Sequence, residues 1–129
     1  MDFLSSNTSL LLERSMGYLW TKQAAVLDNI SNAETPNYKP KVVTFEESLR
    51  GKLESAAGRS HGARRAVRDV LNTEQFAVFE PQEATRMDDN AVNVTEQSVE
   101  MIRNAYQLQY VFNAISSDIN ILRMAIRGQ

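Results

Sequence analysis

The chain has 129 residues, 43% of them hydrophobic, which suffices for one domain with a modest core. Its formal net charge of -2 gives no electrostatic reason to expect nucleic-acid binding, and the absence of cysteine excludes disulfides, thiolate nucleophiles and cysteine-based metal sites. The N-terminal residues lack the basic segment of a secretory signal, and no apolar run approaches the roughly 18 residues that span a bilayer. If the chain leaves the cytosol, we expect it to do so without a cleaved signal peptide.

The first segment, residues 1–32, has the pattern of a long helix. Its mostly apolar stripe alternates spacings of four and three residues, at the positions Leu12, Met16, Leu19, Gln23, Val26 and Ile30. Trp20, Ala24 and Leu27 are expected to widen this stripe. A side-chain oxygen of Ser5, Ser6 or Asn7 is suited to cap the first turn.

The last segment, residues 93–129, has a stronger helical pattern. Its four-three repeat averages 3.5 residues, which is typical of a seam that supercoils against a partner helix; the positions are Met101, Ala105, Leu108, Phe112, Ile115, Ile119, Leu122 and Ile126. Asn93 with Glu96 resembles a capping box, and Gly128 is a plausible stop. A helix from about 94 to 127 would be roughly 50 Å long, too long for a chain of this size to cover.

The outer face of this last helix is unusual because residues 104–117, "NAYQLQYVFNAISS", contain no charge. Amides and phenols suit a surface that is buried against other protein, so we expect Tyr106, Gln109 and Asn113 to contact neighbouring subunits. The alternative is an ordinary bundle helix with a mildly polar exposed face.

The middle segment, residues 33–92, is expected to be only partly ordered. "FEESLRGKLESAAG" predicts a short helix, "KVVTF" an extended run and "EQFAVFE" one short strand, but apolar residues are too sparse for an independent core. The predicted fold is therefore mainly α: one structural unit in which the N- and C-terminal helices pair as a coiled coil or helical hairpin.

Residues with catalytic chemistry are scarce, and we predict no enzyme, cofactor, metal or small-molecule substrate. The single histidine, His61, lies among small residues and arginines, and no phosphate-binding glycine motif occurs. Clustered arginines at 59, 64, 65 and 68 could contact nucleic acid, but no aromatic residue interleaves with them. An acidic protein neighbour or plain solvation explains the cluster better, so nucleic acid is not an expected partner.

The stretch "DNISNAETPNYKPKVVTF", residues 28–45, predicts a helix stop, a tight corner and an exit strand. Amide and hydroxyl side chains at 29, 31 and 32 compete for backbone hydrogen bonds and so end the helix. Proline favours extended backbone at Thr35, Pro36 suits the first central position of a turn, and Asn37 tolerates the positive φ of a type II turn. An ordinary loop is the alternative.

This stretch resembles the axial proteins of the bacterial flagellum, whose rod and hook members carry a helix ending in a motif like "NIANADTPGYK". The approach to the last helix, "DDNAVNVTEQSVEM", is similar to the pattern "GN-x-V-D-x-(D/E)-x-E-M" of proximal rod proteins. The resemblance covers residues 8–48 and 88–127, about two-thirds of the chain. Asn37 replaces a commoner glycine, and Asn93 replaces a usual aspartate while keeping its capping ability. The middle segment has no clear match.

The resemblance implies a non-enzymatic building block of the periplasmic rod, which transmits torque in the basal body. Its implied partners are copies of itself, other rod proteins, the rod's base adaptor, the membrane-supramembrane ring and the flagellar type III export apparatus. It assigns the corner by matching position to Asn29, Asn32, Thr35, Pro36, Asn37, Tyr38 and Lys39. Two alternatives stay open: another flagellar axial component, and a stand-alone helical adaptor.

Overall fold

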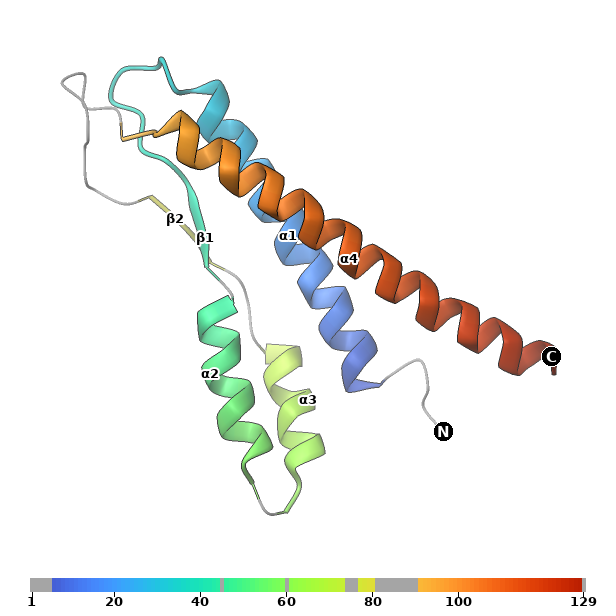
Figure 1. The fold of residues 1–129 in the computed structure, drawn as a ribbon. Coiled ribbons are helices and arrows are strands. Elements are labelled where there is room, and N and C mark those ends of the chain that lie inside the picture. Colours follow the sequence, from blue (N-terminus) through green and yellow to red (C-terminus); the bar gives the residue numbers. More distant parts are fainter. Residues whose placement is uncertain (1–5, 45, 60, 74–76, 81–90, 129) are drawn as a thin grey trace.

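The computed structural model of the chain describes residues 6–44, 46–59, 61–73, 77–80 and 91–128, with the backbone alone for 46–48. In chain order its elements are α1 (Asn7–Ser31), β1 (Val42–Thr44), α2 (Glu46–Ala57), α3 (Ala63–Thr73), β2 (Ala77–Phe79) and α4 (Val94–Arg127). The first and last helices run antiparallel, side by side, while α2 and α3 form a second hairpin beside α1 (Figure 1). The predicted class, mainly α with paired terminal helices, is confirmed. The division into segments 1–32, 33–92 and 93–129 stays a prediction.

Helix α1 begins and ends at side-chain caps. The Ser6 hydroxyl accepts a hydrogen bond from the Ser9 amide at 3.1 Å, which satisfies a backbone donor of the first turn. Its buried residues are Tyr18, Leu19, Ala25, Val26 and Asn29. Trp20, Ala24 and Leu27 are all exposed, so the prediction that they widen the apolar stripe of α1 is wrong.

Helix α4 has the start and stop that the sequence predicts. The Asn93 side chain accepts from the Glu96 amide at 3.3 Å, and Gly128 ends the helix with a left-handed φ of 71°. Residues 88–90 of the preceding motif lie outside the described residues.

The seam between α1 and α4 has a different phase from the predicted one. Within the chain, α4 buries Asn104 and Val111 and half-buries Leu108 and Ile115 against α1. Phe112, by contrast, is 60% exposed. The physical reason is that α4 carries two adjacent apolar stripes that share positions 101, 108, 115 and 122, and α1 covers only one of them.

The middle segment contains more helix than predicted. The helix of "FEESLRGKLESAAG" and the strand of "EQFAVFE" are confirmed, and the extended run provides β1, which pairs antiparallel with β2 in the register Val43 opposite Val78. Helix α3 is the element that sequence analysis missed, because its arginines obscured an apolar face that includes Val67, Val70 and the buried Leu71. Leu71 joins α2 and α1 residues in one core cluster. None of the described helices is long and apolar enough to span a membrane.

Candidate functional site

Asn29 links three parts of the chain at the corner. Its side chain is 1% exposed. Its amide nitrogen donates to the Lys41 carbonyl oxygen and to Gln97 Oε1, both at 2.9 Å. Its Oδ1 accepts from the Lys41 backbone N–H at 2.7 Å and from the Tyr38 hydroxyl at 3.2 Å. One side chain thereby connects the end of α1, the chain leading into β1, and the first turns of α4.

The turn that follows has the predicted geometry. The Tyr38 amide donates to the Thr35 carbonyl at 3.4 Å, and Asn37 has a φ of 60°. Positive φ at the third position of a four-residue turn is the requirement of type II. Asn32 holds the helix end by donating to the Asp28 carbonyl at 2.8 Å and accepting from the Thr35 hydroxyl at 3.2 Å. Pro36 is exposed and Lys39 is half-buried.

An ion pair supports the corner from outside. The Lys41 ammonium donates to the Asp28 carboxylate, which also accepts from the Tyr38 hydroxyl at 3.4 Å. The hydrogen bond from Lys41 lowers the pKa of Asp28, and the same bond raises the pKa of Lys41. Burial, followed by the Asp28 charge, raises the pKa of Tyr38. Both charged groups are more than a third exposed, so the pair orients the turn more than it stabilises the fold.

The seam between α1 and α4 is polar near the corner. Asn104, which is fully buried, donates to the Leu19 carbonyl at 3.0 Å and to Gln23 Oε1 at 2.7 Å, but its own Oδ1 has no hydrogen-bond partner among the described residues. Lys22 pairs with Glu100 at 2.9 Å, and this hydrogen bond lowers the pKa of Glu100. Polar pairs in a seam favour one register, because any shift leaves buried groups unpaired.

The residues predicted for an assembly interface divide into two groups. Those that pack inside the chain, buried or half-buried, are Leu12, Met16, Leu19, Val26, Ile30, Met101, Leu108, Ile115 and Leu122. Those that are exposed on α4 are Ala105, Tyr106, Gln109, Phe112, Asn113, Ile119 and Ile126. The second group, with Tyr110 and Ile102, forms what we call the outer face of α4. Its exposed apolar side chains include Tyr106 at 76% and Phe112 at 60%.

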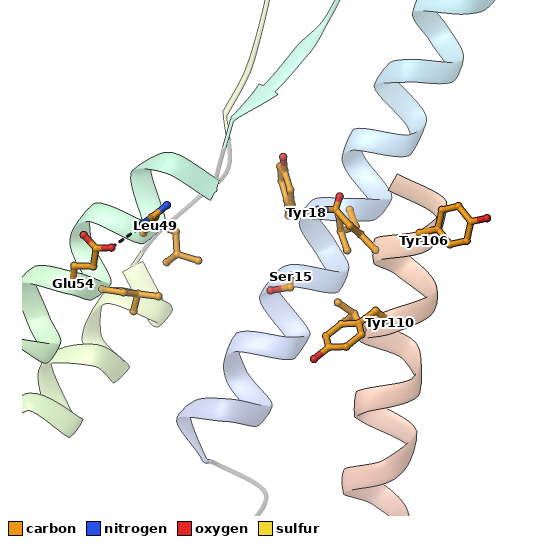
Figure 2. A pocket seen from close by; sticks show the side chains of 11 residues that line it. Ser15, Tyr18, Leu49, Glu54, Tyr106 and Tyr110 are labelled. Atoms are coloured by element: carbon orange, nitrogen blue, oxygen red, sulfur yellow. Dashed lines mark hydrogen bonds and ion pairs between the residues drawn. The ribbon is translucent and has the colours of Figure 1, made fainter. Parts of the chain in front are cut away.

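A groove of about 610 Å³ lies between α1, α2 and α4. Figure 2 shows Leu49 projecting from α2 into this hollow, with Tyr18 of α1 and Tyr110 of α4 on the other side. Its charged lining residues are Arg50 and Glu54, which pair with one another at 3.0 Å. The groove is not predictable from the sequence, because it depends on the docking of α2, which no local pattern specifies.

The partners Lys41 and Gln97 in the corner, and Asn104 in the seam, are likewise not among the residues that the sequence predicts. In the predicted repeat Ala105 follows Met101, so Asn104 lies outside the predicted seam and the periodicity carries no signal for it.

Three of the four clustered arginines, Arg64, Arg65 and Arg68, line one hollow together with Thr8 and Ser9 of α1. Arg59, Arg64 and Arg65 are exposed, and Arg68 donates to the Asn7 side chain at 3.4 Å. His61 is exposed as well. In the described part of the chain, no three histidine, aspartate or glutamate residues come together as metal ligands would.

Comparison with known proteins gives two relatives. The chain is 25% identical over 129 residues to the flagellar basal body rod protein FlgB of Bacillus subtilis (strain 168), covering 97% of each chain. It is 28% identical over 116 residues to FlgB of Aeromonas hydrophila, covering 84% of this chain and 85% of that protein. No family model and no solved structure matches. The similarity to these two flagellar basal body rod proteins extends along most of the chain and of each relative.

Proposed function

We propose that this chain is a structural subunit of the rod of the bacterial flagellar basal body, in its proximal part. Its terminal helices assemble with those of neighbouring subunits into the tubular shaft that transmits torque for motility. The similarity to two FlgB proteins supports this role. The structural observation that carries the proposal is the outer face of α4, whose uncharged apolar and amide side chains are exposed in the described chain.

The energy available from this face suits assembly. Burying a large apolar side chain contributes about 1.5–3 kcal/mol, so Tyr106, Phe112 and Ile119 together supply several kcal/mol for each contact with a neighbour. The exposed amides of Gln109 and Asn113 can hydrogen-bond across such a contact without the cost of burying a charge. The corner has a supporting role here: it fixes the register of α1 on α4 and thereby the shape of this face.

The proposed partners follow from a place in the rod. They are copies of the chain, other rod proteins, the rod's base adaptor and the membrane-supramembrane ring. Delivery is through the flagellar type III export apparatus, without a cleaved signal peptide. The role is structural, and no enzymatic activity is proposed.

A charge on the outer face tests the proposal. Phe112→Asp places a carboxylate on a side chain that is 60% exposed, so the isolated chain should keep its helix content by circular dichroism. We expect the variant to be absent from purified basal bodies and the cells to be non-motile, because desolvating an unpaired carboxylate in a contact is strongly unfavourable.

Gly51→Asp is the matched control. It adds the same carboxylate on exposed α2, where a new side chain meets nothing within 4 Å. This variant should enter basal bodies and support motility. Normal motility with Phe112→Asp would contradict assembly through the outer face.

A further inference from the structure

The start of helix α3 carries arginines that do not stabilise the helix. Negative side chains are favoured in a first turn, but the first turn of α3 contains Arg64 and Arg65 and no acidic residue. Arg68 follows Arg64 by four residues, which brings two like charges together on one face of the helix. Both arrangements are unfavourable for α3, so helix stability does not explain why three arginines gather there.

These arginines line a hollow of about 1,230 Å³ between the starts of α1 and α3 and the later turns of α4. The other two helices contribute Thr8, Ser9, Asp118 and Leu122. Arg64 and Arg65 are exposed, and neither forms an ion pair within the described parts of the chain. Their guanidinium groups are therefore accessible to an anionic partner.

Side-chain hydrogen bonds hold the walls of this arginine hollow together. The Asn7 amide nitrogen donates to the Arg64 carbonyl at 2.9 Å, and the Asn7 Oδ1 accepts from Arg68 Nε at 3.4 Å. Further along the same two helices, Arg14 donates to the Asn72 carbonyl at 3.4 Å. The arginines are thus positioned beside α1 before any partner binds, which lowers the ordering cost of binding.

The other charges of the hollow decide which class of anion it suits. Asp69 and Asp118 also line it, and a nucleic-acid strand, with one charge on every phosphate, would bring phosphates against these carboxylates. Among the described residues, no aromatic side chain lines the hollow for base stacking. An acidic protein segment can alternate its carboxylates with neutral or donor groups. The volume also exceeds the roughly 300–1,000 Å³ of small-ligand clefts, which favours a chain segment over a single small anion.

The spacing of the arginines matches an extended segment. Residues four apart on a helix, such as Arg64 and Arg68, have Cβ atoms about 5–6 Å apart. In an extended chain, residues two apart lie on the same side and about 6.6 Å from each other. We propose that the arginine hollow binds an extended acidic segment of a partner protein, whose carboxylates at alternate positions face Arg64 and Arg68. Arg65 adds a third guanidinium at the exposed edge, and Leu122 offers an apolar contact to the segment.

A labelled peptide with glutamate at every second position and serine between tests this proposal against the full chain. Fluorescence anisotropy should show saturable binding that weakens as salt is added, because the charges are exposed. Changing both Arg64→Gln and Arg65→Gln should weaken binding about tenfold, since two ion pairs are lost. Glutamine is a good helix former, so circular dichroism should show unchanged helix content. Arg68 is left in place because its Nε bond to Asn7 supports the wall.

The matched control removes the same charge from elsewhere on the surface. Arg50→Gln with Arg103→Gln breaks two exposed ion pairs outside the arginine hollow, and the affinity should change by less than about twofold. Equal weakening by the two double variants would show that the peptide responds to net charge alone, and would overturn the proposal.

Two further probes test the chemistry of the partner. A peptide with the same number of glutamates placed side by side should bind several-fold more weakly, and equal affinity would refute the match in spacing. Tighter binding of a single-stranded DNA oligonucleotide of the same length would assign the hollow to nucleic acid, and absence of peptide binding would also overturn the proposal. The rod assignment does not depend on these results, because Phe112→Asp tests a different surface, the outer face of α4.

Discussion

Changing Asn29 to aspartate tests the hydrogen bonds that join α1, the corner and α4. The two side chains have nearly the same shape, and an aspartate oxygen can still accept from the Lys41 amide and the Tyr38 hydroxyl. It cannot donate to the Lys41 carbonyl or to Gln97 Oε1, both at 2.9 Å. Each contact becomes a pair of facing oxygens in a site that is 1% exposed.

The expected loss follows from these two contacts. A buried acceptor left unpaired costs about 1–3 kcal/mol, so the variant should lose about 3 kcal/mol of unfolding free energy or more. A chain of this size has roughly 5–15 kcal/mol in total, so the loss is a large fraction of its stability. Urea titration followed by circular dichroism at 222 nm measures it, with the midpoint expected to fall and the slope to stay unchanged if the folded state keeps its compactness.

Gln97→Met supplies the control for this reasoning. It removes one of the two acceptors and keeps the side-chain length, so we expect a smaller loss of about 1 kcal/mol. Combined with Asn29→Asp, the two changes should cost less than their sum, because they share one contact. An Asn29→Asp midpoint equal to that of the unaltered chain would refute the view that this side chain fixes the corner.

Three further predictions concern the turn and the seam. Asn37→Gly should change the unfolding free energy by less than about 0.5 kcal/mol, whereas Asn37→Val should lower it by about 1–3 kcal/mol, because a β-branched residue is strained at a φ of 60°; the same urea titrations test both. Lys22 holds the pKa of Glu100 below its usual 4.5, so the ion pair's contribution is complete above pH 4.5 and is lost as the pH falls through the lowered value. The melting temperature should therefore drop on acidification below about pH 4.5, and Glu100→Gln should reduce that drop. Replacing both Gln23 and Asn104 with leucine should raise the melting temperature, since it removes a buried unpaired oxygen; a decrease would show that the polar pair is net stabilising.

The parts of the fold that the sequence predicts are those that depend on local chemistry. Caps at Asn93 and Gly128 act within one helical turn, and both ends of α4 are where the sequence places them. The turn at Asn37 is also local, because proline geometry and the tolerance of asparagine for positive φ do not require the rest of the chain.

The parts that the sequence does not predict depend on which elements meet. The role of Asn29 follows from its contacts with Lys41 and Gln97, which lie 12 and 68 residues away. A pattern on one strand or helix cannot encode such distant pairs. The phase of the α4 seam is a similar case: periodicity identifies apolar positions, but only the position of α1 decides that Val111 is covered and Phe112 is not.

The two stripes of α4 offer surfaces for two partners: α1 covers one of them, and under the proposed function a neighbouring subunit covers the other. Positions 101, 108, 115 and 122 border both stripes, so a neighbour that covers Phe112 also completes the burial of Leu108 and Ile115. Burial of a residue by two partners couples the two contacts, because each partner gains more when the other is present. Assembly on the outer face should therefore stabilise the α1–α4 pair itself. If the unpaired Asn104 oxygen lowers the stability of that pair, as the double leucine variant tests, assembly on the outer face should matter all the more to it.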